Sequence, residues 1–174
     1  MGLPVSDEST YRAPAATRIG HVHLKVSDLE RAIGFYRDLL GFDIVARYGD
    51  RAAFLSAGGY HHHIGLNTWE SLNGSKPPRG TTGLYHFAIN FPERVDLARA
   101  FKRLIDGGWP IGGASDHGTH EAIYLDDPDG NGIELAWDRE QSAWFDADGE
   151  IRMVLEPLNF ESLLAELPVE AVTS

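Results

Sequence analysis

Three segments of the chain alternate between apolar and polar positions, the pattern of a half-buried β-strand. In Gly20–Val26 and in Leu84–Phe91, a histidine (His21 or His86) is followed by apolar residues at every second position. Glu134 similarly lies between two apolar residues. Because successive side chains of a strand point to opposite faces, both imidazoles and the carboxylate should face away from the core. The pattern therefore predicts three strands that each present a polar, potentially metal-binding group.

The order of elements around these strands occurs twice. After the first strand, Ser27 and Glu30 have the spacing of a capping box, and apolar residues then follow at helical spacing as far as Gly41. Three short strands separated by glycine turns complete this unit: Phe42–Tyr48, Arg51–Ala57 and Tyr60–Trp69. The second copy has a strand at Leu84–Phe91, a helix with an apolar stripe over Leu97–Ile105, and strands near Trp109–Ala114, Glu121–Asp126 and Gly132–Trp137. The sequence thus predicts an α+β fold of two βαβββ modules.

Composition sets the expected limits of these modules. A polar N-terminus over residues 1–16 is predicted to be flexible, and a single domain to cover residues 17–138. Module 1 is expected at about residues 18–70, a linker at 71–82 and module 2 at about 83–138, because Asn73–Gly80 has the composition of a linker. Residues 139–174 form a C-terminal extension, with a predicted strand near Ile151–Leu155 and an amphipathic helix at Phe160–Leu167.

The repeat also discriminates between two histidines of the first strand. His21 and His86 are 86 − 21 = 65 residues apart and occupy the same slot of each copy, which a duplication explains. The same superposition aligns His23 with Ala88. His21 is therefore the better candidate ligand, and His23 is expected beside it in the substrate pocket.

Glu134 has a counterpart in the first copy that lacks a side chain. Matching the apolar residues on either side places Gly65 in the slot of Glu134. The predicted ligand set is consequently two histidines and one carboxylate, His21, His86 and Glu134, which leaves positions open for substrate and oxygen. This set is typical of non-haem Fe(II) sites, although Mn(II) takes the same ligands.

Charge and cysteine content narrow the classes of function. The net charge of −11 argues against nucleic acid or an anionic membrane surface as a partner. The chain has no cysteine, so any metal must be held by nitrogen or oxygen ligands. No apolar run is long enough for a signal peptide or a membrane span, which predicts a soluble, cytoplasmic protein.

With these features, residues 18–138 resemble the vicinal oxygen chelate superfamily, which includes glyoxalase I, fosfomycin-resistance thiol transferases, bleomycin-binding proteins and extradiol dioxygenases. The resemblance implies a cup-shaped, mostly antiparallel sheet with helices outside and with His21, His86 and Glu134 as inward ligands. The empty slot at Gly65 departs from glyoxalase I, whose members use a fourth protein ligand there.

One segment resembles a narrower group. Asp116–Glu134 is similar to the stretch in CatE-like catechol 2,3-dioxygenases where a His-Gly, an Ile-Tyr pair and an Asp-Pro-x-Gly-Asn turn precede the glutamate ligand. The resemblance places His117 and Tyr124 in catalytic positions. Independently of it, a hairpin centred near Asp129 puts Tyr124 opposite Glu134. We expect an extradiol ring-cleaving dioxygenase that uses Fe(II), a small catechol-like aromatic and O2.

Other histidines and one aromatic residue are assigned to the substrate pocket: His23, His63, Trp109 and His120. In a regular strand His61 and His63 face the cup and His62 the other side, so the three cannot chelate one ion. Asp127–Asp138 nearly matches a calcium-binding EF-hand loop, but its flanks alternate like strands, so we read it as a decoy. A homodimer is expected, because similar dioxygenases continue into further modules.

Three alternatives remain within the resemblance. A thiol transferase of the fosfomycin-resistance kind also uses three ligands, but a loop for its monovalent cation is not recognisable. A glyoxalase-like enzyme would lack its fourth ligand. A binding protein of the bleomycin-resistance kind normally needs no metal, and inward-facing histidines and a glutamate would be wasteful in its apolar cup.

Overall fold

The computed structural model describes residues 11–78 and 80–168, which contain two mixed β-sheets. The first sheet has the order β1-β4-β3-β2, built from β1 (Val22–Lys25), β2 (Asp43–Tyr48), β3 (Ala52–Ser56) and β4 (Ile64–Asn67). The second has the order β5-β8-β7-β6-β9, built from β5 (Phe87–Asn90), β6 (Gly113–Asp116), β7 (His120–Asp126), β8 (Gly132–Asp138) and β9 (Glu156–Pro157). The predicted α+β class and the two βαβββ modules are confirmed, and the strands divide into two sheets with β1 and β5 at their edges.

The strand registers confirm the internal repeat. In each module the first strand runs parallel to the last, and every other strand pair is antiparallel. Val22 pairs with Ile64 in module 1, and Phe87 pairs with Ile133 in module 2. These are the positions that the sequence superposition makes equivalent.

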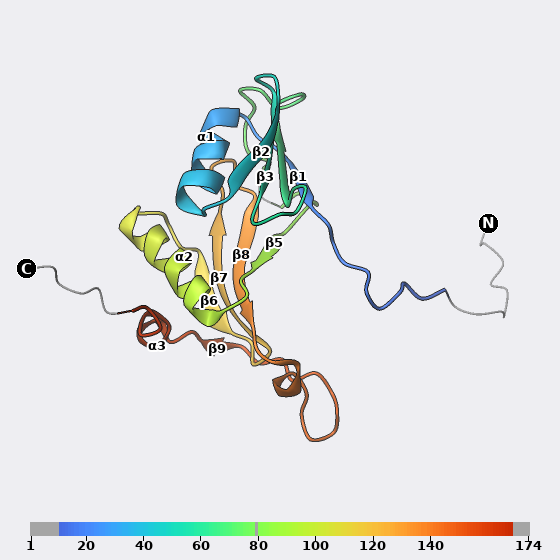
Figure 1. Cartoon of the computed structure of the whole chain (residues 1–174), viewed down its shortest axis with the longest axis vertical. Coiled ribbons are helices and arrows are strands. Elements are labelled where there is room, and N and C mark those ends of the chain that lie inside the picture. Colours follow the sequence, from blue (N-terminus) through green and yellow to red (C-terminus); the bar gives the residue numbers. More distant parts are fainter. Residues whose placement is uncertain (1–10, 79, 169–174) are drawn as a thin grey trace, which may run out of the picture.

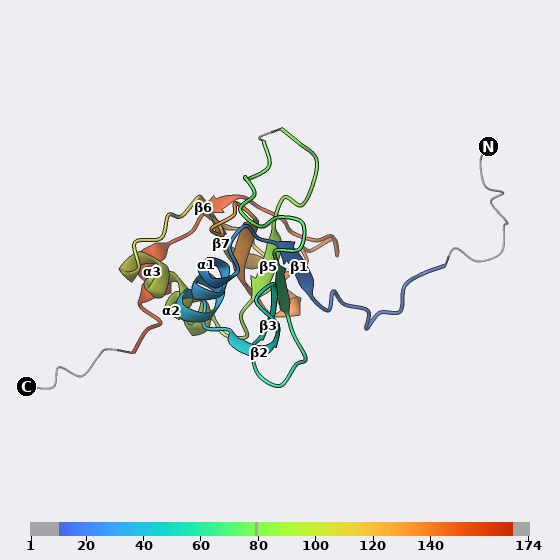
Figure 2. The same cartoon turned by 90° about the horizontal axis from the view of Figure 1, so that it is seen from above.

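Each module carries its helix between the first and second strands. In module 1 this is α1 (Leu29–Ile33), which continues as a π-helical segment, Gly34–Leu39; in module 2 it is α2 (Arg94–Asp106). A 3₁₀ turn at Gln141–Ala143 and the short helix α3 (Phe160–Leu164) follow β8. The helices lie on one side of the molecule, and β1 and β5 lie on the other (Figures 1 and 2). None of the helices within the described ranges is long and apolar enough to cross a bilayer.

The N-cap of α1 differs from the predicted capping box. Asp28, rather than Ser27, is the cap, and its carboxylate accepts a hydrogen bond from the backbone N–H of Arg31 at 3.0 Å. Ser27 is engaged elsewhere: its hydroxyl donates to Asp129 Oδ1 at 2.5 Å. Ser27 therefore bonds a residue of module 2 instead of capping the helix, and the capping box does not form.

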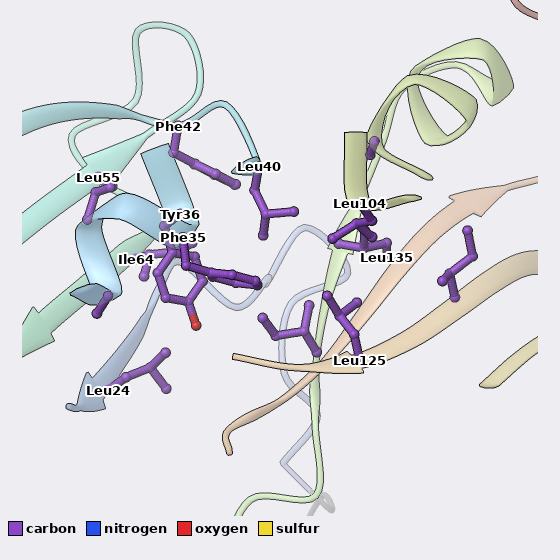
Figure 3. Close-up of a cluster of buried hydrophobic side chains, with 14 of the residues drawn as sticks. Leu24, Phe35, Tyr36, Leu40, Phe42, Leu55, Ile64, Leu104, Leu125 and Leu135 are labelled. Atoms are coloured by element: carbon purple, nitrogen blue, oxygen red, sulfur yellow. The ribbon is translucent and has the colours of Figure 1, made fainter. Parts of the chain in front are cut away.

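A continuous hydrophobic core joins the modules. The apolar faces of both sheets and the buried faces of α1, the π-helical segment and α2 all contribute to it. Figure 3 shows side chains of module 1, such as Phe35 and Leu40, directed toward Leu104, Leu125 and Leu135 of module 2. Alternation in burial is seen in the edge strands β1 and β5, whereas all four residues of the inner strand β4 are buried.

The turn between β7 and β8 is held by module 1. Asp127 is 2% exposed, and its carboxylate accepts hydrogen bonds from the Tyr36 hydroxyl at 2.9 Å and from the Asn131 amide at 2.8 Å. Burial, reinforced by the Asp127 charge, raises the pKa of Tyr36 well above its usual value. Arg31 donates to Asp129 Oδ1 at 2.8 Å. Strands flank this turn on both sides, as predicted for a sequence that only mimics an EF-hand loop.

Several predicted strands have different bounds in the structure. The first strands of the two modules begin only at Val22 and Phe87, directly after His21 and His86. The segment predicted at Tyr60–Trp69 is a strand only over Ile64–Asn67, and residues 57–63 form turns. The strand predicted near Trp109–Ala114 lies at Gly113–Asp116, after Gly107 and Gly108 end α2. In the extension, Ile151 forms only an isolated bridge with Phe145, and the ladder partner of β6 is Glu156–Pro157.

Candidate metal and catalytic site

The polar face of module 2 brings Tyr124 and Glu134 together. The two residues are direct cross-strand partners in the β7–β8 hairpin, which confirms the arrangement expected from the sequence. On its other side Glu134 pairs with Ala88 of β5, and His86 lies immediately before β5. The apolar neighbours of Glu134, Ile133 and Leu135, are fully buried in the core on the opposite face.

Both oxygens of Glu134 face imidazole nitrogens. Oε2 lies 2.9 Å from His86 Nε2, and Oε1 lies 3.0 Å from His120 Nε2. Glu134 is only 7% exposed, so its charge is largely withdrawn from water. A carboxylate in this position needs compensating partners, which protonated imidazoles, N–H donors or a cation can supply.

The position of His120 adds a contact that we did not predict. We expected this residue in the substrate pocket, whereas the structure places its ring on the carboxylate of Glu134. His120 shares a strand face with Tyr124, and the pair Ala122 and Ala136 lies between the imidazole and Glu134. Small side chains there leave space for the ring to lie along the sheet. Alternation along β7 could have predicted this contact, because it puts His120 on the same face as Tyr124, the cross-strand partner of Glu134.

Tyr124 connects Glu134 with His117. The phenolic oxygen lies 2.8 Å from His117 Nε2 and 3.3 Å from Glu134 Oε1. Burial, followed by the charge and hydrogen bond of Glu134, raises the pKa of Tyr124 to about 12. The hydroxyl therefore keeps its proton at neutral pH and remains able to donate a hydrogen bond.

The equivalent slot of module 1 is filled differently. His23 pairs with Gly65 just as Ala88 pairs with Glu134. A Cβ atom at Gly65 would lie 2.9 Å from the His23 ring, so this imidazole occupies the space that a side chain would need. Desolvation, together with the charge of His21, lowers the pKa of His23. Gly65 thus supplies no ligand, and the His23 ring packs directly against it.

His21 faces the same cavity as His86. The two histidines line a cavity of about 580 Å³ between the edges of β1 and β5, together with His63 and apolar residues. His63 is fixed there by Ser56, whose Oγ lies 3.1 Å from Nδ1. Its assignment to the substrate pocket stays a prediction that this placement allows.

The donor atoms suit a metal ion, although they are not gathered around one point. Within the described ranges, no three His, Asp or Glu side chains stand close enough to hold one ion. His86 and the buried Glu134 are already adjacent, and His21 reaches the shared cavity from module 1. Imidazole nitrogen with carboxylate oxygen is a donor set that fits Fe(II) or Mn(II).

The predicted arrangement of His61, His62 and His63 is wrong. Residues 57–63 are not a strand, so alternation does not apply to them. The ring of His62, expected on the opposite face, lies 4.4 Å from that of His21. The nearby glycines Gly58 and Gly59 end β3 in a turn, which gives the histidine run its irregular path.

Trp109 lies apart from these groups, so its assignment to the substrate pocket is corrected. Its ring packs 4.7 Å from that of Phe35, and its indole N–H donates to the Asp126 carbonyl at 3.0 Å. It lines a separate hollow with Leu39 and Pro128. The cause is the later start of β6, which leaves Trp109 beside the end of α2.

A second cavity opens beside Tyr124. It measures about 340 Å³, and Tyr85, His86, Ile111 and Tyr124 are among its lining residues. His86 borders both this cavity and the larger one. A small planar molecule in either cavity would therefore be next to His86, and in the smaller cavity it would also be next to Tyr124.

The amino-acid sequence matches a known protein family. The sequence model described as "Glyoxalase/Bleomycin resistance protein/Dioxygenase superfamily" matches residues 18–135. The chain is 42% identical over 159 residues to a catechol-2,3-dioxygenase from Bacillus subtilis, covering 91% of this chain and 55% of that protein. It is 34% identical over 124 residues to biphenyl-2,3-diol 1,2-dioxygenase 3 from Rhodococcus globerulus, covering 70% of this chain and 63% of that protein. The chain thus spans less than two thirds of either relative.

Among solved structures, the fold is similar to a glyoxalase/dioxygenase from Nostoc punctiforme. The TM-score is 0.61 with 21% sequence identity, and the match covers 76% of this chain and 99% of that chain. At this identity the similarity concerns the fold alone. It agrees with the paired βαβββ modules described above.

Proposed function

The chain belongs to the glyoxalase/bleomycin resistance protein/dioxygenase superfamily, and we propose that it is an extradiol ring-cleaving dioxygenase acting on a catechol-like aromatic with Fe(II) and O2. The observation that carries this proposal is the contiguous set Glu134, Tyr124 and His117 beside His86. The identity to a catechol-2,3-dioxygenase over most of the chain supports it.

We propose His21, His86 and Glu134 as the metal ligands. When bound there, Fe(II) would bring the two diol oxygens and O2 together and let electrons pass between them. His120 lies against the same carboxylate and would orient Glu134, as neighbours of metal ligands commonly do. Gly65 adds no fourth protein ligand, which leaves room for a bidentate diol.

The remaining residues handle protons. His117, as a neutral imidazole, would take a proton from a substrate hydroxyl at Nε2, the nitrogen that faces Tyr124. Tyr124, protonated at neutral pH, would donate a hydrogen bond to a substrate oxygen. In the overall reaction one ring C–C bond beside the diol breaks, and both atoms of O2 enter the product.

One experiment tests the reaction class. The protein is purified anaerobically, its metal content is measured, and Fe(II) and catechol are added while O2 uptake and a yellow ring-opened semialdehyde are followed. We expect one metal ion per chain and equal consumption of O2 and catechol. Bound metal without O2 uptake across several catechols would point to another reaction of the superfamily. Absence of both metal binding and uptake would favour a binding protein.

A pair of adjacent histidines tests the ligand assignment. His21→Ala should abolish tight metal binding, whereas His62→Ala, which changes the ring packed against His21, should retain it. Metal content after gel filtration decides between them. If both variants keep the ion, His21 is not a ligand.

His117→Ala tests the proton-transfer step. We expect the variant to bind iron as the wild type does and to turn over catechol on the order of 10²-fold more slowly, the usual loss for a general acid–base group. His61→Ala is the control, because that imidazole is exposed and belongs to module 1. Unchanged turnover in His117→Ala would remove the role assigned to this residue.

A further inference from the structure

The C-terminal extension contacts the loop that carries His117. Val154 lies 37 residues further along the chain, and its backbone N–H donates to the His117 carbonyl at 3.0 Å. The Val154 carbonyl in turn lies 3.2 Å from His117 Nδ1. Val154 is half-buried, whereas residues 150–153 and 155–157 are exposed. The extension therefore contacts the His117 loop through the backbone of Val154.

Two further contacts fix the same loop. Arg139, the first residue after β8, donates to both oxygens of Asp116 at 2.7 and 2.9 Å. Gly118 has a φ of +79°, and a Cβ there would lie 3.2 Å from both the Arg152 carbonyl oxygen and a Val154 methyl group. The loop thus passes close under the extension at a position where only glycine fits easily.

A carbonyl oxygen accepts hydrogen bonds and cannot donate them, which determines the imidazole tautomer. Bonding to the Val154 carbonyl requires the hydrogen of a neutral His117 to be on Nδ1. Nε2 then carries the lone pair, and the Tyr124 hydroxyl 2.8 Å away must donate to it. One hydroxyl hydrogen cannot serve two acceptors at full strength, so the 3.3 Å contact with Glu134 becomes the weaker one.

We propose that the C-terminal extension is part of the site: the Val154 carbonyl holds His117 in the tautomer with its hydrogen on Nδ1. Nε2 then keeps its lone pair, which accepts the Tyr124 hydrogen and can accept a proton once that hydroxyl turns to a substrate oxygen. Val154 is a positioning residue, since it acts through His117. The tautomer follows from the contacts alone, whereas its effect on turnover rests on the proposed dioxygenase function. A different tautomer would direct an N–H toward Tyr124 and leave no base on that side.

The tautomer can be measured directly. Metal-free protein with ¹⁵N-labelled histidine is examined by long-range ¹H–¹⁵N correlation at about pH 8, above the ordinary imidazole pKa near 6.5. The His117 signals are assigned by their loss in His117→Gln. We expect a protonated Nδ1 and an unprotonated Nε2. The reverse tautomer, or an even mixture, in the wild-type protein would overturn the proposal.

Two glycine substitutions test the role of the extension. Gly118→Ala places a methyl group against Arg152 and Val154, while Gly149→Ala has a similar φ of +82° but no atom within 4 Å of its added Cβ. Both variants therefore carry comparable backbone strain, and only Gly118→Ala should disturb the contact between Val154 and His117. Gly118→Ala should give a mixture of His117 tautomers and lower kcat on the order of tenfold with KM nearly unchanged. Gly149→Ala should match the wild type in both measurements.

The outcomes separate this proposal from the proposed function. A Gly118→Ala protein with the wild-type tautomer and kcat would overturn the role of the extension. Should this variant fail to fold, the wild-type tautomer still decides the central point. If the wild type shows the expected tautomer but no ring cleavage with any catechol, the dioxygenase proposal fails and the Val154–His117 contact stands.

Discussion

The two modules share one backbone register but fill the equivalent slot in opposite ways. In module 1 the bulky residue is on the first strand, where His23 faces Gly65. In module 2 it is on the last strand, where Ala88 faces Glu134. Each pair thus combines one large and one small side chain. In a duplicated fold the large side chain can therefore be on either strand of the equivalent pair. The set of potential ligands then differs between the modules although the strand pairing is the same.

The comparison also shows where the proposed site acquires its additional groups. The last strands of module 2 carry Glu134, Tyr124 and His120 on one face, and the C-terminal extension supports His117 beside them. Module 1 contributes His21 and His63 to the adjoining cavity. The modules therefore have the same fold but contribute different polar groups to the proposed site. Substitutions in each module test this difference.

Removing the carboxylate from module 2 should have the largest effect. Glu134→Gln is expected to weaken metal binding by more than about 100-fold, beyond the loss typical of residues that only support a ligand. Ring cleavage should fall with it. Asp138→Asn, an exposed carboxylate further along β8, is the matched control. Metal titration followed by an activity assay checks both, and equal affinities would show that Glu134 is not a ligand.

Breaking the contact between module 1 and the β7–β8 turn should destabilise the whole protein. Asp127→Ala removes the acceptor of the buried Tyr36 hydroxyl and of the Asn131 amide. We expect a loss of roughly 2 kcal/mol in the free energy of unfolding, because buried donors are left unsatisfied. Chemical denaturation measures this loss. Asp126→Ala, an exposed neighbour, should change stability by much less, and similar losses in the two variants would contradict the explanation.

Adding a side chain to the small slot of module 1 should have a moderate effect. Gly65→Ala places its Cβ 2.9 Å from the His23 ring, and overpacking of this kind costs on the order of 1 kcal/mol or more. Combining it with His23→Ala should restore part of that loss, since the ring is gone. A double-mutant cycle by thermal unfolding measures the coupling. Additive effects would mean that the ring and the glycine do not compete for the same space.

The smallest expected effect concerns the ion pair at the start of the extension. The hydrogen bonds from Arg139 lower the pKa of Asp116. Its contribution to stability is therefore present above the unfolded pKa, near 3.9, and is lost as the pH falls through the lower folded value. Asp116→Asn, which leaves the hydrogen bond from Arg139 to the buried Glu121 in place, should destabilise the protein at pH 7 by less than about 1 kcal/mol, and this difference should shrink in acid. Thermal melts across pH, with Arg99→Gln as the control, test the trend.

The sequence by itself determined the faces and the register of the strands. Alternation identified which side chains of β5, β7 and β8 turn away from the core, and hairpin symmetry placed Tyr124 opposite Glu134. The repeat in the sequence makes His23 and Gly65 equivalent to Ala88 and Glu134, and the strand pairs have this equivalence. These features are local or periodic, so the direction of each Cβ follows from its position in its own strand.

Only the tertiary structure decided which distant segments meet. The contact of Val154 with His117, the use of Ser27 by Asp129 instead of as a helix cap, and the packing of Trp109 on Phe35 all join separate parts of the chain. His62 turned toward His21 because its segment is a turn, where alternation has no meaning. Such contacts depend on how loops and modules pack, and no repeating pattern in the sequence specifies that packing.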